Sequence, residues 1–224
     1  MEELGKIHQL IVSLSGYKMV FNLDAIIYTW IVMLLILLFG FLATRRRGIV
    51  PGSMQVLGEL FVSKLYELTE DALGEKMAKT YAPLVCALFM FLVLGNWIGI
   101  IPHLEEPTKD LNTPLSLGVM GFVIAHYVGI KSKGFKAYIS EYFQPFFIMM
   151  PLNLIGEVAK IVSISFRLFG NIMGGAIIIL VVSYLTWSIL LPPFLNAFFG
   201  LFVGAIQAFV FTMLTVVYIS VQVK

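Results

Sequence analysis

Residues 146–191 read FFIMMPLNLIGEVAKIVSISFRLFGNIMGGAIIILVVSYLTWSILL. Only Glu157, Lys160 and Arg167 in this stretch are charged, and no proline follows Pro151 within it. If most of it is helical, its roughly 40 residues extend about 60 Å, whereas the hydrocarbon core of a bilayer is about 30 Å thick. We therefore predict a membrane helix that is steeply inclined, bent, or partly outside the bilayer.

Four further stretches are almost free of charge and long enough to span a bilayer. They are residues 25–44, 80–102, 113–130 and 194–222. The last would form a helix about 45 Å long, which raises the same difficulty. The expected fold is an all-α membrane protein with about five membrane helices, of which the last two are long and steeply inclined. We expect residues 1–224 to form a single integral membrane domain, because no repeat or flexible linker divides them.

The composition excludes several classes of protein. Apolar residues make up 59% of the 224 residues, charged residues only 12%, and the mean hydropathy is +0.94. A soluble domain carries about twice that share of charge. The net charge of +2 provides no general basic field, so nucleic acid is not expected as a partner. The single cysteine, Cys86, excludes a disulfide framework and a thiolate cluster, and no metal or cofactor is expected.

The loops predict the orientation of the chain. Three arginines (residues 45–47) follow the first span and three lysines (within 131–136) follow the third, whereas the loop HLEEPTKDLN (residues 103–112) is acidic. Cytoplasmic loops carry the excess of Lys and Arg. We therefore expect the N-terminus outside and the C-terminus in the cytoplasm.

Residues 53–74 show apolar side chains at helical spacing and charged ones on the other side. Ser53 is the expected N-cap. The pattern fits a helix lying in the cytoplasmic interface of the membrane. An ordinary surface helix that packs on a partner remains the alternative.

Polar and small residues in the two long segments recur every three or four positions, which places them on one face of each helix. They are Asn153, Glu157, Lys160, Ser163, Arg167, Asn171 and Gly174 in the first segment, and Asn196, Gly200, Gly204, Gln207, Thr215, Tyr218 and Gln222 in the second. Two helices of this kind are expected to enclose hydrated grooves between them.

Arg167 is the main functional candidate. Its guanidinium stays charged, and an arginine in mid-membrane costs about 2.5–3.5 kcal/mol on insertion scales. One interpretation is a structural ion pair with Glu157. Ten residues along a straight helix separate the two by about 15 Å, however, and Lys160 is the natural partner of Glu157. The functional interpretation leaves Arg167 without an acid in its own chain, so that another polypeptide supplies the carboxylate.

Weaker candidates lie elsewhere in the spans. His126 is typical of a packed or interfacial histidine, and a proton relay through it or through Tyr218 is the alternative. Asn96 and Trp97 are expected to be interface anchors.

The stretch SISFRLFGN (residues 163–171) closely resembles the signature of subunit a of F-type ATP synthases. Other segments resemble the family in the same order, over roughly residues 20–222. They are GNWIGIIPH (95–103), PTKDLNTPLSL (107–117), HYVGIKSKGF (126–135), PLNLIGEVAK (151–160) and GAIQAFVFTMLTVVYIS (204–220).

The resemblance implies a static ion channel beside a rotating ring, in a complex whose catalytic sites lie on other subunits. Arg167 resembles the family's essential arginine, which prevents leak and promotes ion release from a ring carboxylate. Two offset half-channels would carry the ion to and from that carboxylate. The implied partners are the c-ring, the peripheral-stalk b subunits, the rest of the F1Fo complex and membrane lipid, and the expected location is a bacterial plasma membrane.

Further residues are carried over from the family's pattern. Asn171 and Gln207 match polar residues near the ion path, and Glu157 and Lys160 match its polar approach; Ser163 stands within the signature. Two positions depart from the pattern, because many proton-coupled members have Glu where this chain has Ala176 and some have His at Gly200. We expect H⁺ as the coupling ion through a water-filled path, with Na⁺ as the alternative.

A stand-alone secondary transporter is the competing function. Such proteins show related halves and a midplane site on interrupted helices, and this chain lacks that symmetry. A membrane serine hydrolase would need a nucleophile turn of the type G-x-S-x-G, which is absent. A G-x-x-x-x-G-K-[ST] phosphate loop is absent too, so no ATP chemistry is expected in this chain.

Overall fold

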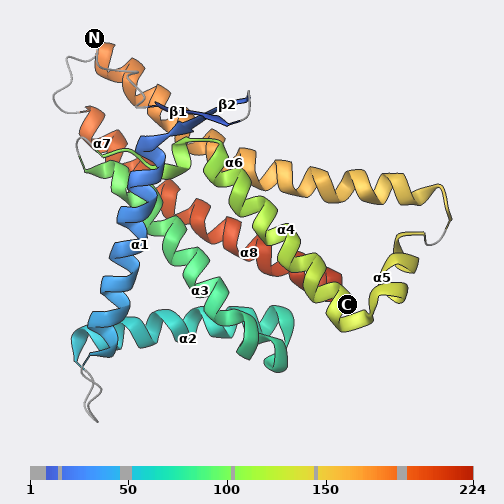
Figure 1. Cartoon of the computed structure of the whole chain (residues 1–224). Coiled ribbons are helices and arrows are strands. Elements are labelled where there is room, and N and C mark those ends of the chain that lie inside the picture. The colour runs from blue at the N-terminus through green and yellow to red at the C-terminus, as the bar shows by residue number, and fades with distance from the viewer. Residues whose placement is uncertain are drawn as a thin grey trace.

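The computed structural model describes residues 9–14, 17–45, 52–101, 104–143, 146–185 and 191–223. Its elements in chain order are β1 (Gln9–Leu14), β2 (Tyr17–Asn22), α1 (Leu23–Thr44), α2 (Ser53–Leu73), α3 (Glu75–Trp97), η1 (Ile98–Ile100), η2 (Pro107–Lys109), α4 (Asn112–Lys133), α5 (Phe135–Tyr142), α6 (Met149–Leu185), α7 (Leu191–Ala197), η3 (Phe198–Val203) and α8 (Gly204–Val223). Figure 1 shows their arrangement.

Five helical stretches are long and apolar enough to cross a membrane, which confirms the expected fold class. They are Leu23–Thr44, Glu75–Ile100, Asn112–Lys133, Met149–Leu185 and Leu191–Val223. The predicted ends at residue 102 and at 186–190 lie outside the described residues, as do Arg46 and Arg47. In Figure 1, α6 runs across the direction of α1 rather than along it, and its 37 residues would extend about 56 Å.

Two elements were not predicted. A hairpin, in which β1 pairs antiparallel with β2, precedes α1. The helix α5 follows Gly134, whose φ of 85° is accessible to glycine at little cost. Its eight residues are too few to give a clear helical period.

The helix α2 lies across the lower end of α1 in Figure 1 and packs on α1, α3 and α8. Leu65 and Thr69 face that contact and are buried, whereas Val56, Leu57 and Leu60 are exposed. An exposed apolar face suits the interface helix that we expected. The predicted N-cap is wrong, because Gly52 occupies that position and Ser53 is the first helical residue.

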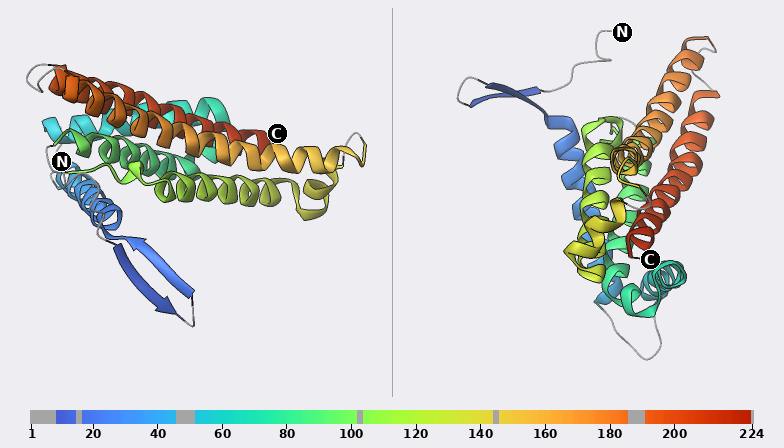
Figure 2. Two further views of the ribbon diagram at one scale, coloured as in Figure 1. Left: turned by 90° about the horizontal axis from the view of Figure 1, so that it is seen from above. Right: turned by 90° about the vertical axis from the view of Figure 1, so that its right-hand side faces the viewer.

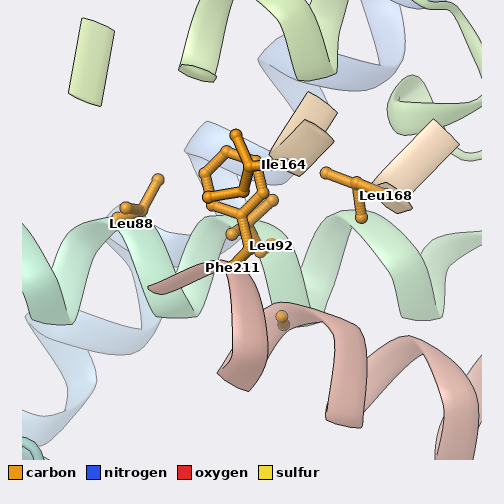
Figure 3. Packing of buried hydrophobic residues seen from close by; sticks show 6 residues of the cluster. Leu88, Leu92, Ile164, Leu168 and Phe211 are labelled. Carbon is orange, nitrogen blue, oxygen red and sulfur yellow. The ribbon is translucent and has the colours of Figure 1, made fainter. Parts of the chain in front are cut away.

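The core lies where α3, α6 and α8 meet. Leu88 and Leu92 of α3 contact Ile164 and Leu168 of α6, together with Phe211 of α8, as Figure 3 shows. In the left view of Figure 2, α6 and α8 run side by side, and α4 lies along them in the lower part of the picture. This packing fixes the position of α6 along α8, and it therefore determines which polar residues of the two helices lie close together.

The last predicted span is not one continuous α-helix. A π-helical turn, η3, separates α7 from α8. Two side chains at the end of α3 donate to backbone carbonyls of this turn and of the first residue of α8. Trp97 Nε1 donates to the Leu201 carbonyl at 3.2 Å, and Asn96 Nδ2 donates to the Gly204 carbonyl at 2.9 Å.

Asn96 is therefore not the interface anchor that we expected. It is 2% exposed and accepts a bond from Thr108 Oγ1 at 2.9 Å. Its amide thus ties α3, η2 and α8 together at one end of the molecule.

Candidate functional site

Arg167 lies near the middle of α6, on the side of the helix that faces away from the rest of the chain. Its neighbours Ile164, Ser165 and Leu168 are buried against α4 and α8, whereas Arg167 itself is exposed. It forms no hydrogen bond or ion pair with any described residue. The structural ion pair with Glu157 is therefore not formed.

Small residues flank Arg167 along the same face of α6. Gly156, Gly170 and Gly174 have no atom within 4 Å of an added Cβ, and Ser163 is exposed between Lys160 and Arg167. Helices approach each other closely in membranes where such small residues line their contact. This exposed face, from Gly156 to Gly174, is called the arginine face below.

The expected pair of Glu157 and Lys160 is present. Lys160 Nζ lies 2.6 Å from Glu157 Oε1, with the two side chains 34% and 14% exposed. The same ammonium group lies 5.7 Å from the centre of the Tyr218 ring on α8. Glu157 is thus already neutralised and is not available to Arg167.

The polar faces of the two long segments also meet beyond Arg167. Asn171 Nδ2, one turn beyond Arg167, donates to Gln207 Oε1 at 2.7 Å. Gln207 is 4% exposed, and its Nε2 is buried without a partner among the described residues. An unpaired buried donor is costly, so this amide marks a place where water or a ligand group fits.

We expected the two faces to enclose hydrated grooves, but they do not do so along their whole length. Gly200, Gly204, Gln207, Thr215 and Gln222 are buried, because this side of the last segment packs on the other helices. The corresponding face of α6 is largely exposed. Among the described residues, the Asn171–Gln207 bond and the Lys160–Tyr218 contact join them.

A cavity of about 960 Å³ extends from that bond to the acidic loop between α3 and α4. Asn171 and Gln207 line it at one end, and Glu106 lines it at the loop end. Ala176 and Gly200, the two positions that depart from the family's pattern, line it between them. We call it the outer cavity. A side chain at Gly200 would meet Ile100 rather than open space, so only position 176 could carry a titratable side chain without crowding this wall.

Glycines shape the walls of the outer cavity. A Cβ on Gly200 would lie 2.5 Å from Ile100 Cγ1, and one on Gly175 would lie 3.1 Å from the Phe199 ring. Gly175 is thus a point of close approach between α6 and η3, whereas Gly170 and Gly174 face open space.

A second polar cluster surrounds His126, at the opposite end of α8. A small cavity of about 10 Å³, too small to be more than a water-sized void, is lined by His126, Glu157, Lys160 and Tyr218. The two relay candidates and the ion pair thus share one site. The Phe122 ring packs on the His126 ring, with centroids 3.8 Å apart.

Hydrogen bonds continue from His126 into α5. His126 Nδ1 lies 3.0 Å from the Phe122 carbonyl and Nε2 lies 3.2 Å from the Tyr142 hydroxyl. Tyr142 then contacts the Tyr138 hydroxyl at 3.0 Å, and Tyr138 donates to Gln222 Oε1 at 2.9 Å. These contacts link His126 through two tyrosine hydroxyls to the last turn of α8.

Sequence reasoning missed both tyrosines because α5 was not predicted. Burial and the bond to Tyr142 raise the pKa of Tyr138 well above its usual range, so its hydroxyl keeps its proton. It acts as a donor to Gln222 at any physiological pH.

The geometry defines an integral membrane protein in which Arg167 lies on an open helix face without a partner among the described residues, and polar clusters lie towards both ends of α6 and α8. The sequence model of the ATP synthase A chain family matches residues 26–220. The chain belongs to this family.

Similar proteins carry the same description. The chain is 38% identical over 197 residues to "ATP synthase subunit a" of Moorella thermoacetica, covering 88% of this chain and 89% of that protein. It is 40% identical over 185 residues to "ATP synthase subunit a" of Aliarcobacter butzleri, covering 80% and 79%. A third relative of the same description, from Acidothermus cellulolyticus, is 40% identical over 184 residues, with 78% of this chain and 66% of that protein covered.

Proposed function

We propose that this chain is the static ion channel of a rotary ATP synthase, in which Arg167 faces a carboxylate carried past it by a rotating c-ring. The observation that carries this proposal is the exposed position of Arg167, without a counter-ion among the described residues, in the middle of a 37-residue apolar helix. A guanidinium there is costly unless a carboxylate from another chain meets it.

The arginine face suits this docking. The space beside Gly156, Gly170 and Gly174 lets a ring helix approach the backbone of α6 closely. An opposite charge within about 4–6 Å favours the ionised form of a carboxylate. Arg167 therefore promotes release of the bound ion, and its positive charge opposes the passage of cations straight across.

The outer cavity supplies the entry path. Ions enter beside the acidic loop and reach the ring carboxylate near Asn171 and Gln207, where the unpaired Gln207 amide holds water or the carboxylate itself. The exit path starts at the opposite end of α6, where Glu157, Lys160 and Tyr218 meet His126. The two paths are offset along α6 on either side of Arg167, so an ion passes from one to the other only on the turning ring.

We propose H⁺ as the coupling ion. The hydrogen-bonded chain from His126 to Gln222 includes an imidazole and two hydroxyl groups, which exchange protons with water and favour H⁺ on the exit side. The absence of a carboxylate at Ala176 leaves Na⁺ as the alternative. The peripheral-stalk b subunits are proposed as further partners. A bacterial plasma membrane is the proposed location, and the basic loops support an orientation with the N-terminus outside and the C-terminus in the cytoplasm.

The experiment is replacement of Arg167 in the complete complex. Arg167→Ala should abolish ATP synthesis driven by an imposed membrane potential, while the complex assembles and its detached catalytic head hydrolyses ATP normally. Phe166→Ala, at the neighbouring exposed and apolar position, is the matched control and should retain most synthesis. Normal synthesis by Arg167→Ala would overturn the proposal.

A sodium assay separates the two ions. ATP hydrolysis by the whole complex should be independent of added Na⁺, and Na⁺ should not protect the ring carboxylate from carbodiimide labelling. Stimulation and protection by Na⁺ would replace H⁺ in the proposal and leave the role of Arg167 unchanged.

A further inference from the structure

Glu106 lies in a part of the acidic loop that is held firmly in place. The next two residues, Pro107 and Thr108, are buried, and Thr108 donates its hydroxyl hydrogen to Asn96. The turn η2 that they begin packs on α1, α3, α4 and α6. The loop therefore positions the Glu106 side chain on a rigid support.

The carboxyl of Glu106 packs against the backbone of Gly99. A Cβ at Gly99 would collide with Glu106 Oε1 and Cδ, so the position is available to this carboxyl only because residue 99 is glycine. Among the described residues Glu106 has no ion-pair partner. Its neighbour Glu105 is exposed and instead pairs with Lys109 at 3.2 Å.

The surroundings of Glu106 shift the pKa of its carboxyl. Burial raises the pKa of Glu106 above its usual value, its own backbone N–H and Lys109 oppose this, and Glu105 adds to it. Tyr184 of α6 is the one further titratable residue lining the outer cavity, and α7, η3 and α8 contribute none to that lining. Asp24 and Asp110 lie on the α1 side of η2, where Asp110 accepts a bond from Asn22.

We propose that Glu106 is the proton-exchanging carboxyl of the outer cavity, which takes a proton from external water and passes it to water inside the cavity. In the first step hydronium protonates the carboxylate and leaves water. In the second step the carboxylic acid protonates a cavity water on the path to Asn171 and Gln207, and the carboxylate is restored. The inference rests on the proposed function with H⁺ as the coupling ion. It assigns the titratable group that Ala176 and Gly200 do not provide.

The test uses the complete complex in proteoliposomes, with ATP synthesis measured against external pH at constant total driving force. Glu106→Gln should lower the rate about 10-fold, less than the roughly 100-fold that a positioned proton-transfer group contributes, because cavity water offers a parallel route. The wild-type rate should fall as external pH rises through the pKa of Glu106. We call this fall the pH step, and Glu106→Gln should lack it.

Three further variants separate a proton relay from a structural role. Glu106→Asp keeps a carboxyl and should recover most of the rate together with the pH step. Gly99→Ala displaces the carboxyl without removing it and should lose the step. Glu75→Gln removes an exposed, paired charge that does not line the outer cavity and should stay within about twofold of the wild type, as expected for an exposed pair.

An unchanged rate and pH profile in Glu106→Gln would overturn the inference. Equal losses in Glu106→Gln and Glu106→Asp, with the pH step retained in both, would show a packing role and overturn it as well. Arg167→Ala in the same preparation separates failure of the Glu106 relay from failure of the proposed function. If Arg167→Ala abolishes synthesis while Glu106→Gln is normal, the proposed function stands without this relay. If Arg167→Ala is normal, the proposed function itself fails.

Discussion

The bond between Asn171 and Gln207 gives the most specific prediction. Gln207→Leu removes the acceptor of a 2.7 Å bond and leaves Asn171 Nδ2 without it. The change puts an apolar side chain of similar size in a position that is 4% exposed, so the packing of α8 should be preserved. Two features are lost: the hydrogen bond that positions Asn171, one turn from Arg167, and the unpaired Gln207 amide at the end of the outer cavity.

The magnitude follows from bonds between membrane helices, which contribute about 0.6 kcal/mol on average and at most about 1.7 kcal/mol. At about 1.4 kcal/mol per factor of ten, the rate of passive proton conduction should fall roughly 3- to 20-fold. The assay is proton flux through the membrane part of the complex after the catalytic head has been removed. Thr212→Val is the matched control, because Thr212 is buried on the same helix but bonds only to the Ala208 carbonyl of its own helix.

A double-mutant cycle tests the reasoning. If the bond carries the effect, Asn171→Leu and Gln207→Leu together should slow conduction little more than either change alone. Effects that multiply independently, or a normal rate in Gln207→Leu, would refute the assignment and leave Gln207 as a packing residue.

Three further predictions concern stability and pH. Glu157→Gln should destabilise the chain by roughly 1–3 kcal/mol, less than the 3–5 kcal/mol of a fully buried pair because Lys160 is 34% exposed, and thermal unfolding should show recovery when Lys160→Met is added. Gly175→Val should cost about 1–3 kcal/mol in the same assay, because its Cβ would lie 3.1 Å from the Phe199 ring; an unchanged midpoint would contradict the close approach. The raised pKa of Glu106 means that the folded loop binds its proton more tightly than the unfolded chain, so loop stability is present at low pH and falls as pH rises through the folded-state value. The protection of the η2 amides against exchange, relative to the base-catalysed intrinsic rate, should fall over that range in the wild type and not in Glu106→Gln.

Charge spacing was sufficient to predict much of this molecule. Uninterrupted apolar stretches located the five membrane helices because a bilayer tolerates few charges. The three-residue spacing of Glu157 and Lys160 predicted their pair, since such residues are neighbours on a helix surface. These features depend on local sequence alone.

The remaining features depend on which helices meet. Asn96 has the sequence context of an interface anchor, yet the π-helical turn of a segment 108 residues away supplies its acceptor. The partnership of Tyr138 with His126 requires α5, which is too short to be recognised by its period. Glu106 looked like one of several loop acids, and only the packing of its carboxyl on Gly99 distinguishes it from Glu105.

The central claim concerns the partner of Arg167. A cryo-electron microscopy structure of the assembled complex would measure the distance from its guanidinium to the nearest carboxylate of any chain. Our account predicts a carboxylate of a ring helix, docked on the arginine face, within about 6 Å in at least one rotational state. A guanidinium held by an acid of its own chain, or one that faces only lipid, would contradict the account.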